Sequence, residues 1–315
     1  MPDSPVYPER VRIVEVGPRD GLQNEPQPVT LEQKLTFIRA LADAGLQQIE
    51  VTSFVHPKAV PQLADAFDLA TSLPTLDGVT WSALVPNDKG LERAMEAGIK
   101  RIAVFTAASD SFTGRNIRMT VDESLRVFEG IVPQALRQGM TVRGYVSTAF
   151  VCPYEGNVSP ERVASVSRSL VEMGIDEVAI SDTIGAAAPR DVHAVLDQVI
   201  PVCGIDRIAL HLHDTYGTAL ANVYAGLLRG VRTFDASAGG LGGCPYAPGA
   251  SGNLATEDLV YFLDRMGIET GVSLDAVASA AAGVMQHIEP RQPSRQMARL
   301  RAATQHDDPS AMEAG

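Results

Sequence analysis

The 315-residue sequence has few cysteines, few basic residues and no long apolar run. Its three cysteines, an odd and sparse set, do not suit a disulfide framework and are typical of a reducing compartment. No stretch approaches the ~18 consecutive apolar residues of a membrane helix, which argues against a membrane-spanning protein. The first residues, Met1-Pro2-Asp3-Ser4-Pro5, lack a basic region and an apolar region, so we expect no secretion signal. Together these absences predict a soluble cytoplasmic protein.

Acidic residues outnumber basic residues by 38 to 26, which gives a formal net charge of -12. This balance argues against nucleic acid or an anionic membrane surface as the main partner. It leaves room for a local cationic pocket that binds a phosphorylated substrate. With 45% hydrophobic and 20% charged residues, the composition is otherwise that of an ordinary globular protein with a sizeable core.

A short pattern repeats along the chain: a glycine and an aliphatic residue, two polar or small residues, and then alternating apolar positions. Clear copies begin at Gly45, Gly98, Gly174 and Gly204, and a looser copy begins at Gly230. Each glycine suits the position just after a helix, where φ is positive and a side chain is costly. Each run that follows is short and rich in β-branched residues, which is typical of a buried strand.

The segments before these glycines have the features of helices. Thr30 and Thr120 each begin a capping box, and Ser159 is an N-cap candidate followed by Pro160. Apolar residues then recur at helical spacing. A further amphipathic helix is predicted over residues 273–288.

Strands and helices therefore alternate along most of the chain. We expect strands near residues 11–17, 48–54, 80–85, 101–107, 141–149, 177–182, 207–213 and 233–238. Eight strands with helical crossovers in roughly 250 to 300 residues favour an α/β fold of the TIM type, a (β/α)8 barrel. A doubly wound open sheet is the competing fold, but the turn Gly17-Pro-Arg-Asp-Gly21 lacks the G-x-G-x-x-G phosphate fingerprint. We predict one catalytic barrel over residues 1–289, including the C-terminal helix, and a polar, frayed tail over 290–315.

Candidate functional residues in such a barrel lie at the carboxyl ends of strands and in the loops that follow. His211-Leu-His213 ends the seventh expected strand, and a period of two puts both imidazoles on one face. The two histidines can share a metal ion, or they can form a hydrogen-bonded structural pair. Asp20 and Asn253 are candidate further ligands, although Asp20 lies in an ordinary turn sequence and Asn253 could cap a helix. Such a mixed oxygen and nitrogen set suits Mg²⁺ or Mn²⁺ better than a closed zinc site.

Glu50, Asp182 and Cys244 are further candidates for catalysis. Glu50 lies among apolar β residues, where a carboxylate must be paired or functional, and Arg19 on the neighbouring strand is its expected partner. Asp182 closes the sixth expected strand. Cys244 lies in the glycine-rich segment 239–246, which favours a mobile loop that delivers a thiol. A loop that cradles a phosphate is the alternative, but the segment lacks the Gly-Lys-Ser ending of a P-loop.

Two strand residues and two cysteines give weaker signals. Arg143 and Tyr145 alternate along the fifth expected strand and therefore face one side together. Cys203 falls in a helix–strand connection, and we interpret it as structural. Cys152 lies in a second Cys-Pro-Tyr sequence, and we leave open whether its role is structural or functional.

Several longer motifs carry more specific information. They are Arg19-Asp-Gly-Leu-Gln-Asn-Glu25, Thr52-Ser-Phe-Val55, Cys152-Pro-Tyr-Glu-Gly156, His211-Leu-His213, Gly242-Gly-Cys-Pro-Tyr-Ala247 and Ala250-Ser-Gly-Asn-Leu-Ala-Thr-Glu-Asp258. From about residue 10 to about 272 the chain strongly resembles the 3-hydroxy-3-methylglutaryl-CoA lyases. These belong to a group of metal-dependent barrel lyases and Claisen-type synthases named for an Asp-Arg-Glu constellation, which Asp20, Arg19 and Glu50 match.

The resemblance implies a site and a reaction. It implies a divalent metal, Mg²⁺ or Mn²⁺, and the ligands Asp20, His211, His213 and Asn253. It also implies a catalytic Cys244 and roles in the site for Arg19, Glu50, Asp182, His211 and Glu257. The implied reaction is the metal-dependent cleavage of 3-hydroxy-3-methylglutaryl-CoA to acetoacetate and acetyl-CoA. An acyl-CoA is then the expected partner, with no nucleic acid and no membrane, and the resemblance suggests a homodimer.

The residue types suit this chemistry, because a tertiary alcohol must lose its proton while the departing fragment becomes a thioester enolate. His211 or Asp20 can take the proton, and the permanently cationic Arg19 can stabilise the enolate oxygen. Cys244 can protonate the enolate carbon, and Glu50 would orient Arg19.

Three alternatives stay open. A longer 3-hydroxy-3-alkylglutaryl-CoA, such as the isohexenyl analogue, would be cleaved by the same chemistry. A Claisen-type synthase would read Arg-Asp-Gly-Glu-Gln where this chain has Arg19-Asp-Gly-Leu-Gln23. A metal-binding barrel without activity would not need a thiol in a glycine-rich loop. Two departures from the family, His56 in place of serine and the stretch beyond Val272, bear on which acyl chain the pocket accepts.

Overall fold

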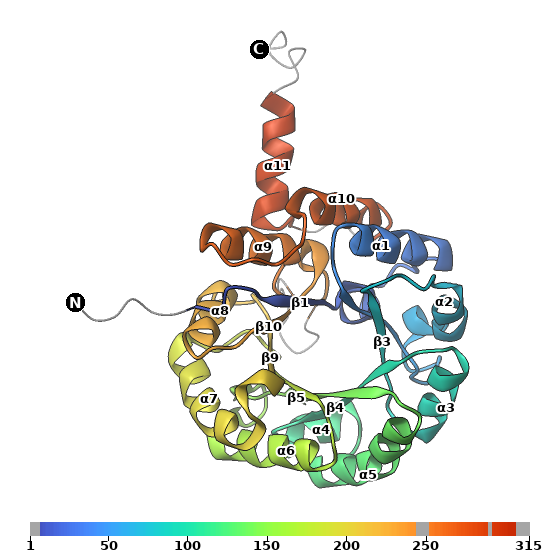
Figure 1. The fold of residues 1–315 in the computed structure, drawn as a ribbon, viewed down its shortest axis with the longest axis vertical. Helices are drawn as coiled ribbons and strands as arrows, with labels where there is room; N and C mark the ends of the chain where they lie inside the picture. The colour runs from blue at the N-terminus through green and yellow to red at the C-terminus, as the bar shows by residue number, and fades with distance from the viewer. Residues whose placement is uncertain (1–6, 244–251, 289–291, 307–315) are drawn as a thin grey trace, which may run out of the picture.

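The centre of the molecule is a closed barrel of parallel strands (Figure 1). The computed structural model describes residues 7–243, 252–288 and 292–306. The strands follow one another around the barrel in the order β1-β10-β9-β8-β5-β4-β3-β2. Their bounds are β1 Arg12–Glu15, β2 Gln48–Ser53, β3 Thr80–Leu84, β4 Arg101–Ala107, β5 Thr141–Ser147, β8 Glu177–Asp182, β9 Ile208–Leu212 and β10 Thr233–Ala236. Each predicted strand contains one of these, so the predicted TIM barrel is confirmed.

Helices cover the outside of the barrel (Figure 1). They include α1 Leu31–Asp43, α2 Ala66–Ser72, α3 Asp88–Glu96, α5 Val121–Arg137, α6 Pro160–Glu172, α7 Pro189–Cys203, α8 Ala219–Leu228 and α9 Thr256–Arg265. Thr30 and Thr120 form the predicted capping boxes, and Ser159 caps α6. Gly45 and Gly174 follow α1 and α6 with φ of 100° and 97°, as predicted for helix ends. None of the described helices is long and apolar enough to cross a membrane.

Shorter elements lie in the loops between the strands and helices. They are η1 Gly17–Gly21, η2 Pro61–Leu63, α4 Asp110–Asn116, the two-stranded sheet of β6 Val151–Cys152 and β7 Gly156–Asn157, η3 Ile205–Arg207 and η4 Ala238–Gly240. Of these, η1 and η4 directly follow β1 and β10, which are neighbours in the barrel. They therefore lie side by side at the carboxyl ends of the strands.

The main hydrophobic core lies between the strands and the surrounding helices. Ile38 and Leu41 of α1 and Ile49 of β2 belong to it and are fully buried. The inside of the barrel is different, because a small apolar cluster around Ala103, Tyr145 and Ala209 shares it with charged side chains. The barrel thus holds charged groups in a place that water does not reach.

The C-terminal part of the chain adds two helices, α10 Leu274–Met285 and α11 Arg295–His306. Helix α10 lies within the predicted range of 273–288. The frayed tail expected from residue 290 is wrong for residues 295–306, because these form α11. The start of α11 docks on α9: Met297 is buried, and the Gln296 amide donates to Asp258 at 2.8 Å. Most of α11 extends away from the barrel (Figure 1), so it needs no apolar stripe that a sequence pattern would reveal.

Candidate active site

Three predicted metal ligands meet at the carboxyl ends of the strands. Asp20 lies in η1, His211 lies in β9, and His213 follows β9 directly. One ligand atom of each residue lies within 4.8 Å of the others. The two imidazole Nε2 atoms face each other at 3.2 Å, which confirms that both rings share a face.

The tight turn after β1 explains why Asp20 reaches this place. The Val16 carbonyl accepts hydrogen bonds from the amides of Arg19, Asp20 and Gly21 at 2.8 to 3.2 Å. Space at Gly21 is so limited that a Cβ would lie 2.8 Å from Ser237 Oγ. The turn therefore packs directly against the loop after β10, and the Asp20 side chain lies beside β9.

Asn253 joins the same cluster. Its Nδ2 donates to Asp20 Oδ2 at 2.8 Å and to the Leu241 carbonyl at 3.0 Å. The residue is 3% exposed and pairs with His213 through an isolated antiparallel bridge. The alternative that Asn253 caps a helix is wrong, because Ala255 is the residue that precedes α9.

The residues present fit a divalent cation. Ligands at adjacent positions of an ion with bonds of about 2.1 Å lie about 3 Å apart, close to the Nε2 separation observed. Burial, helped by His211, lowers the pKa of His213 to about 3, so this ring is neutral and has a lone pair to offer. Its Nε2 faces His211 Nε2 and is therefore the candidate coordinating atom, whereas its Nδ1 is buried without a hydrogen-bond partner among the described residues.

Asp20 supplies the negative charge of this cluster. Burial alone would raise the pKa of its carboxyl, but Arg19 and the two histidines more than offset that effect and hold the pKa below its usual range. An ionised carboxylate with two imidazole nitrogens is a donor set for Mg²⁺, Mn²⁺ or a similar ion.

The expected pair of Arg19 and Glu50 is present. Arg19 Nε donates to Glu50, and Arg19 Nη1 lies 2.6 Å from Asp20 Oδ1. The Tyr145 hydroxyl donates to the other Glu50 oxygen at 3.0 Å. Both charged side chains are at least 93% buried, with 7% of Arg19 and 1% of Glu50 exposed. Glu50 therefore holds the guanidinium beside the candidate metal position.

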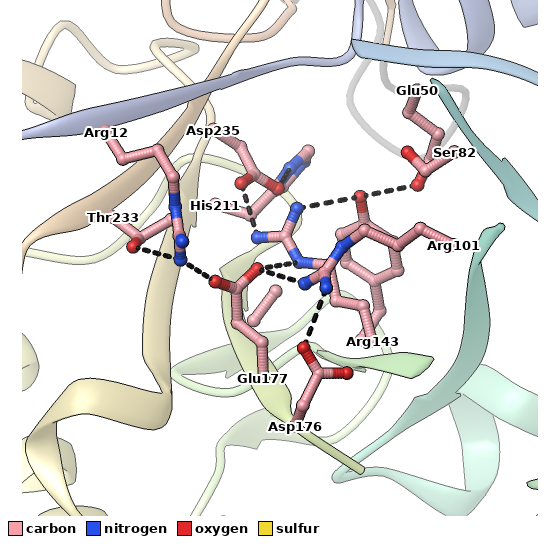
Figure 2. Close-up of polar contacts among 12 residues, drawn as sticks. Arg12, Glu50, Ser82, Arg101, Arg143, Asp176, Glu177, His211, Thr233 and Asp235 are labelled. Atoms are coloured by element: carbon pink, nitrogen blue, oxygen red, sulfur yellow. Dashed lines mark hydrogen bonds and ion pairs between the residues drawn. The ribbon is translucent and has the colours of Figure 1, made fainter. Parts of the chain in front are cut away.

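A second buried network reaches His211 from below (Figure 2). Arg143 Nη2 lies 2.5 Å from Asp235 Oδ1, and Asp235 Oδ2 lies 3.0 Å from His211 Nδ1. Arg143 Nε lies 3.1 Å from Glu177, which also binds Arg101 at 3.2 Å and Arg12.

Sequence reasoning placed Arg143 and Tyr145 on one face of a strand, and the structure confirms this. It missed Asp235 and Glu177. The signal that singled out Glu50, a carboxylate within a β-rich run, is also present in Phe234-Asp235-Ala236 and Glu177-Val178-Ala179.

Glu15 is another buried carboxylate near the site that was not among the predicted residues. Its Oε1 accepts the amides of Gly17 at 2.8 Å and Ala238 at 2.9 Å, and its Oε2 accepts the Thr256 hydroxyl at 2.7 Å. It is fully buried, and burial raises its pKa to about 7. Glu15 thereby ties η1, which carries Asp20, to η4 and the start of α9.

Asp182 and Glu257 hold the loops around the cluster. Asp182 accepts the amides of Ala186 and Ala187, both at 3.0 Å, and burial raises its pKa to about 6. Glu257 is fully buried and accepts the amide of Gly239 at 3.0 Å and the hydroxyl of Ser294. Its contacts thus lead to η4 and α11, whereas the contacts of Asp182 fix the loop after β8.

The three cysteines and His56 complete the predicted candidates. Cys244 lies outside the described residues. Cys152 and Cys203 are buried, and Cys152 Sγ lies 3.0 Å from Ser109 Oγ, so both fit structural roles. His56 is exposed, and its Nδ1 accepts the amide of Lys58 at 3.2 Å.

The fold and the site define a TIM barrel with a candidate divalent-metal centre at the carboxyl ends of its strands. The family model described as HMGL-like matches residues 10–284, and the chain belongs to this family. It is 49% identical to hydroxymethylglutaryl-CoA lyase YngG of Bacillus subtilis, over 92% of this chain and 97% of that protein. It is 48% identical to the 3-hydroxy-3-isohexenylglutaryl-CoA/hydroxy-methylglutaryl-CoA lyase of Pseudomonas aeruginosa, over 87% of this chain and 91% of that protein. A crystal structure of hydroxymethylglutaryl-CoA lyase from Pseudomonas aeruginosa superimposes with a TM-score of 0.92 at 45% identity, covering 94% of this chain and 99% of that one.

Proposed function

We propose that this protein is a carbon–carbon lyase that cleaves 3-hydroxy-3-methylglutaryl-CoA to acetoacetate and acetyl-CoA with Mg²⁺ or Mn²⁺. The observation that carries the proposal is the placement of Arg19, a buried guanidinium 2.6 Å from Asp20, which is part of the histidine cluster. In this reaction an alcohol becomes a carbonyl and a thioester becomes an enolate. Both changes require a fixed cation next to a divalent-metal position. Membership of the HMGL-like family and the lyase names of the relatives support the same reaction.

Asp20, His211, His213 and Asn253 would hold the metal ion. When bound, it would lower the pKa of the substrate alcohol and fix the orientation of that group. Asp20 and His211 are the two candidate bases for the alcohol proton, because both lie beside the proposed metal position. The carboxylate of Asp20 keeps lone pairs beyond those used by Arg19 and Asn253, whereas His211 Nδ1 contacts Asp235.

Arg19 stabilises the developing enolate. Its Nε bond to Glu50 and its Nη1 bond to Asp20 fix the guanidinium plane, so little reorganisation is needed as charge develops on the thioester oxygen. The hydroxyl of Tyr145 in turn holds Glu50, and burial raises the pKa of this hydroxyl well above its usual value, so it stays a donor. Cys244 is the proposed proton donor to the enolate carbon.

A second candidate substrate is the isohexenyl analogue, or another longer 3-hydroxy-3-alkylglutaryl-CoA. The observation that favours it is the name of the Pseudomonas aeruginosa relative, which includes both substrates. The same residues would serve, because the bond that breaks and the groups that flank it are the same. The Claisen-type synthase is less well supported, since the relatives described above are lyases.

Release of acetyl-CoA from 3-hydroxy-3-methylglutaryl-CoA tests the proposal, measured in chelator, in Mg²⁺ and in Mn²⁺. Cys244→Ala and the isohexenyl substrate are the parallel reactions. We expect metal-dependent cleavage that is lost in the variant. Cleavage of only the longer substrate would keep the mechanism and replace the substrate. Failure to cleave either substrate, with metal bound, would refute the lyase proposal and favour a synthase assay.

A homodimer, a cytoplasmic location and the extent of the catalytic barrel over residues 1–289 stay predictions. Sedimentation of the purified chain at micromolar concentration tests the first. An assembly of two chains is the expected result, and a single chain at all concentrations would contradict it.

A further inference from the structure

Asp235 contacts both Arg143 and His211, and these two contacts together bear on the protonation of the His211 ring. The carboxylate lies in β10, and its backbone is directly opposite His211 in the neighbouring strand β9. One oxygen lies 2.5 Å from Arg143 Nη2, and the other lies 3.0 Å from His211 Nδ1. Only 1% of the Asp235 side chain and 3% of the Arg143 side chain are exposed, so solvent does not replace either contact.

Arg143 determines the state of Asp235. A guanidinium has donors and no acceptor, so the oxygen that faces it must accept. Arg143 is itself held in place by Glu177, which lies 3.1 Å from its Nε and also binds Arg101 at 3.2 Å (Figure 2). Asp235 thus forms a buried ion pair with the guanidinium of Arg143. The carboxylate of an ion pair only accepts hydrogen bonds, so both oxygens of Asp235 are acceptors.

We infer that Asp235 is a positioning residue that fixes the tautomer of His211. An acceptor at Nδ1 requires the proton of a neutral imidazole to be on Nδ1, which leaves a lone pair on Nε2. That atom faces His213 Nε2 at 3.2 Å and points to the candidate metal position. The series of contacts from Glu177 through Arg143 to Asp235 thus selects the tautomer of His211 that can bind a cation. This inference rests on the metal centre of the proposed function.

An isosteric substitution distinguishes this role from simple packing. In Asp235→Asn, Arg143 still requires an oxygen at its side, so the amide nitrogen must turn toward His211 Nδ1. An amide nitrogen only donates, so Nδ1 would have to accept and the imidazole proton would move to Nε2. The ring would then present a hydrogen to the metal position, although shape and volume are unchanged.

Binding of Mn²⁺ to the full chain, followed by the spin-resonance signal of free Mn²⁺, is the first measurement. We expect Asp235→Asn to weaken Mn²⁺ binding about 10- to 100-fold, as loss of a carboxylate behind a metal-binding histidine does. Asp176→Asn is the matched control: it removes a carboxylate that pairs with Arg101 at 2.7 Å in the same network, without contact to His211. Its Mn²⁺ affinity should equal that of the unsubstituted chain.

The outcomes separate the inference from the proposal beneath it. Mn²⁺ affinity unchanged in Asp235→Asn would overturn the role of Asp235 and leave the metal centre intact. Equal weakening in Asp176→Asn would also overturn it, because the effect would then be one of net charge. Failure of the unsubstituted chain to bind Mn²⁺ would overturn both the metal centre and the inference.

A measurement on the unsubstituted chain decides the matter if Asp235→Asn does not fold. Long-range ¹H–¹⁵N spectra of ¹⁵N-histidine-labelled, metal-free protein report the tautomer of each ring. The His211 signal is the one lost in His211→Gln. A protonated Nδ1 and an unprotonated Nε2 are expected. The opposite tautomer would overturn the inference, since Asp235 would not be acting as the acceptor at Nδ1.

Discussion

We predict that Glu15 makes the unfolding free energy of this protein depend on pH, and that the substitution Glu15→Gln removes this dependence. The carboxyl is fully buried where η1, η4 and α9 meet, and burial raises its pKa from 4.5 to about 7. A raised pKa means that the folded state favours the protonated form. The resulting stabilisation is complete below about pH 4.5 and is lost as the pH rises through about 7. Since each pKa unit corresponds to ~1.4 kcal/mol, the full contribution is about 3 kcal/mol.

Glu15→Gln is the perturbation that isolates this effect. The glutamine oxygen can accept the amides of Gly17 and Ala238 as Oε1 does now, and its amide can donate to the Thr256 hydroxyl, which rotates. The variant therefore resembles the protonated wild type at every pH. Relative to this variant, the wild type should lose about 2.5 kcal/mol of unfolding free energy between about pH 5 and pH 8.

The assay is urea unfolding followed by circular dichroism, for both proteins at several pH values in this range. Only the difference between the two proteins is interpreted, because other titrating groups contribute equally to both. Glu129→Gln, an exposed glutamate in the middle of α5, is the control and should show no such trend. A difference between wild type and Glu15→Gln that stays constant with pH would refute the reasoning, since Glu15 would then not be a buried acid that favours its proton.

Three further predictions concern the site and the C-terminal helix. Gly252→Ala should reduce lyase activity at least ~100-fold, because a Cβ would lie 1.8 Å from the Gly242 carbonyl and displace Asn253. Gly98→Ala also has a positive φ but nothing within 4 Å, so it should cost about 1 kcal/mol in urea unfolding and leave activity unchanged. Ser294→Ala should lower the unfolding free energy by about 1 kcal/mol through loss of a helix cap, and Ser294→Thr should restore most of it. Arg19→Lys should lower kcat about 100- to 1000-fold with a smaller change in KM, because an ammonium group cannot form both fixed contacts of the guanidinium; equal kcat would contradict its role.

The sequence alone determined the parts of this protein that depend on local chemistry. The capping boxes at Thr30 and Thr120 form between residues three apart, and the glycines after helices follow from the conformational freedom that a missing Cβ gives. The shared face of His211 and His213 follows from the two-residue period of a strand. The Arg19–Glu50 pair was also predictable, because consecutive strands of a barrel are neighbours and a buried carboxylate requires a partner.

The tertiary structure alone decided which distant charges meet inside the barrel. Asp235 binds Arg143 across 92 residues of sequence, and Glu15 binds Ala238 across 223. No local pattern encodes either contact. Arg143 of β5 reaches Asp235 of β10 across the inside of the barrel, because β9 and β8 lie between these strands. Glu15 reaches Ala238 because β1 pairs with β10 and closes the barrel. The docking of α11 on α9 is similar, since it rests on Ser294 and one buried methionine and not on an apolar stripe. Local periodicity shows which side chains face inward, but only the closed barrel determines which of them meet there.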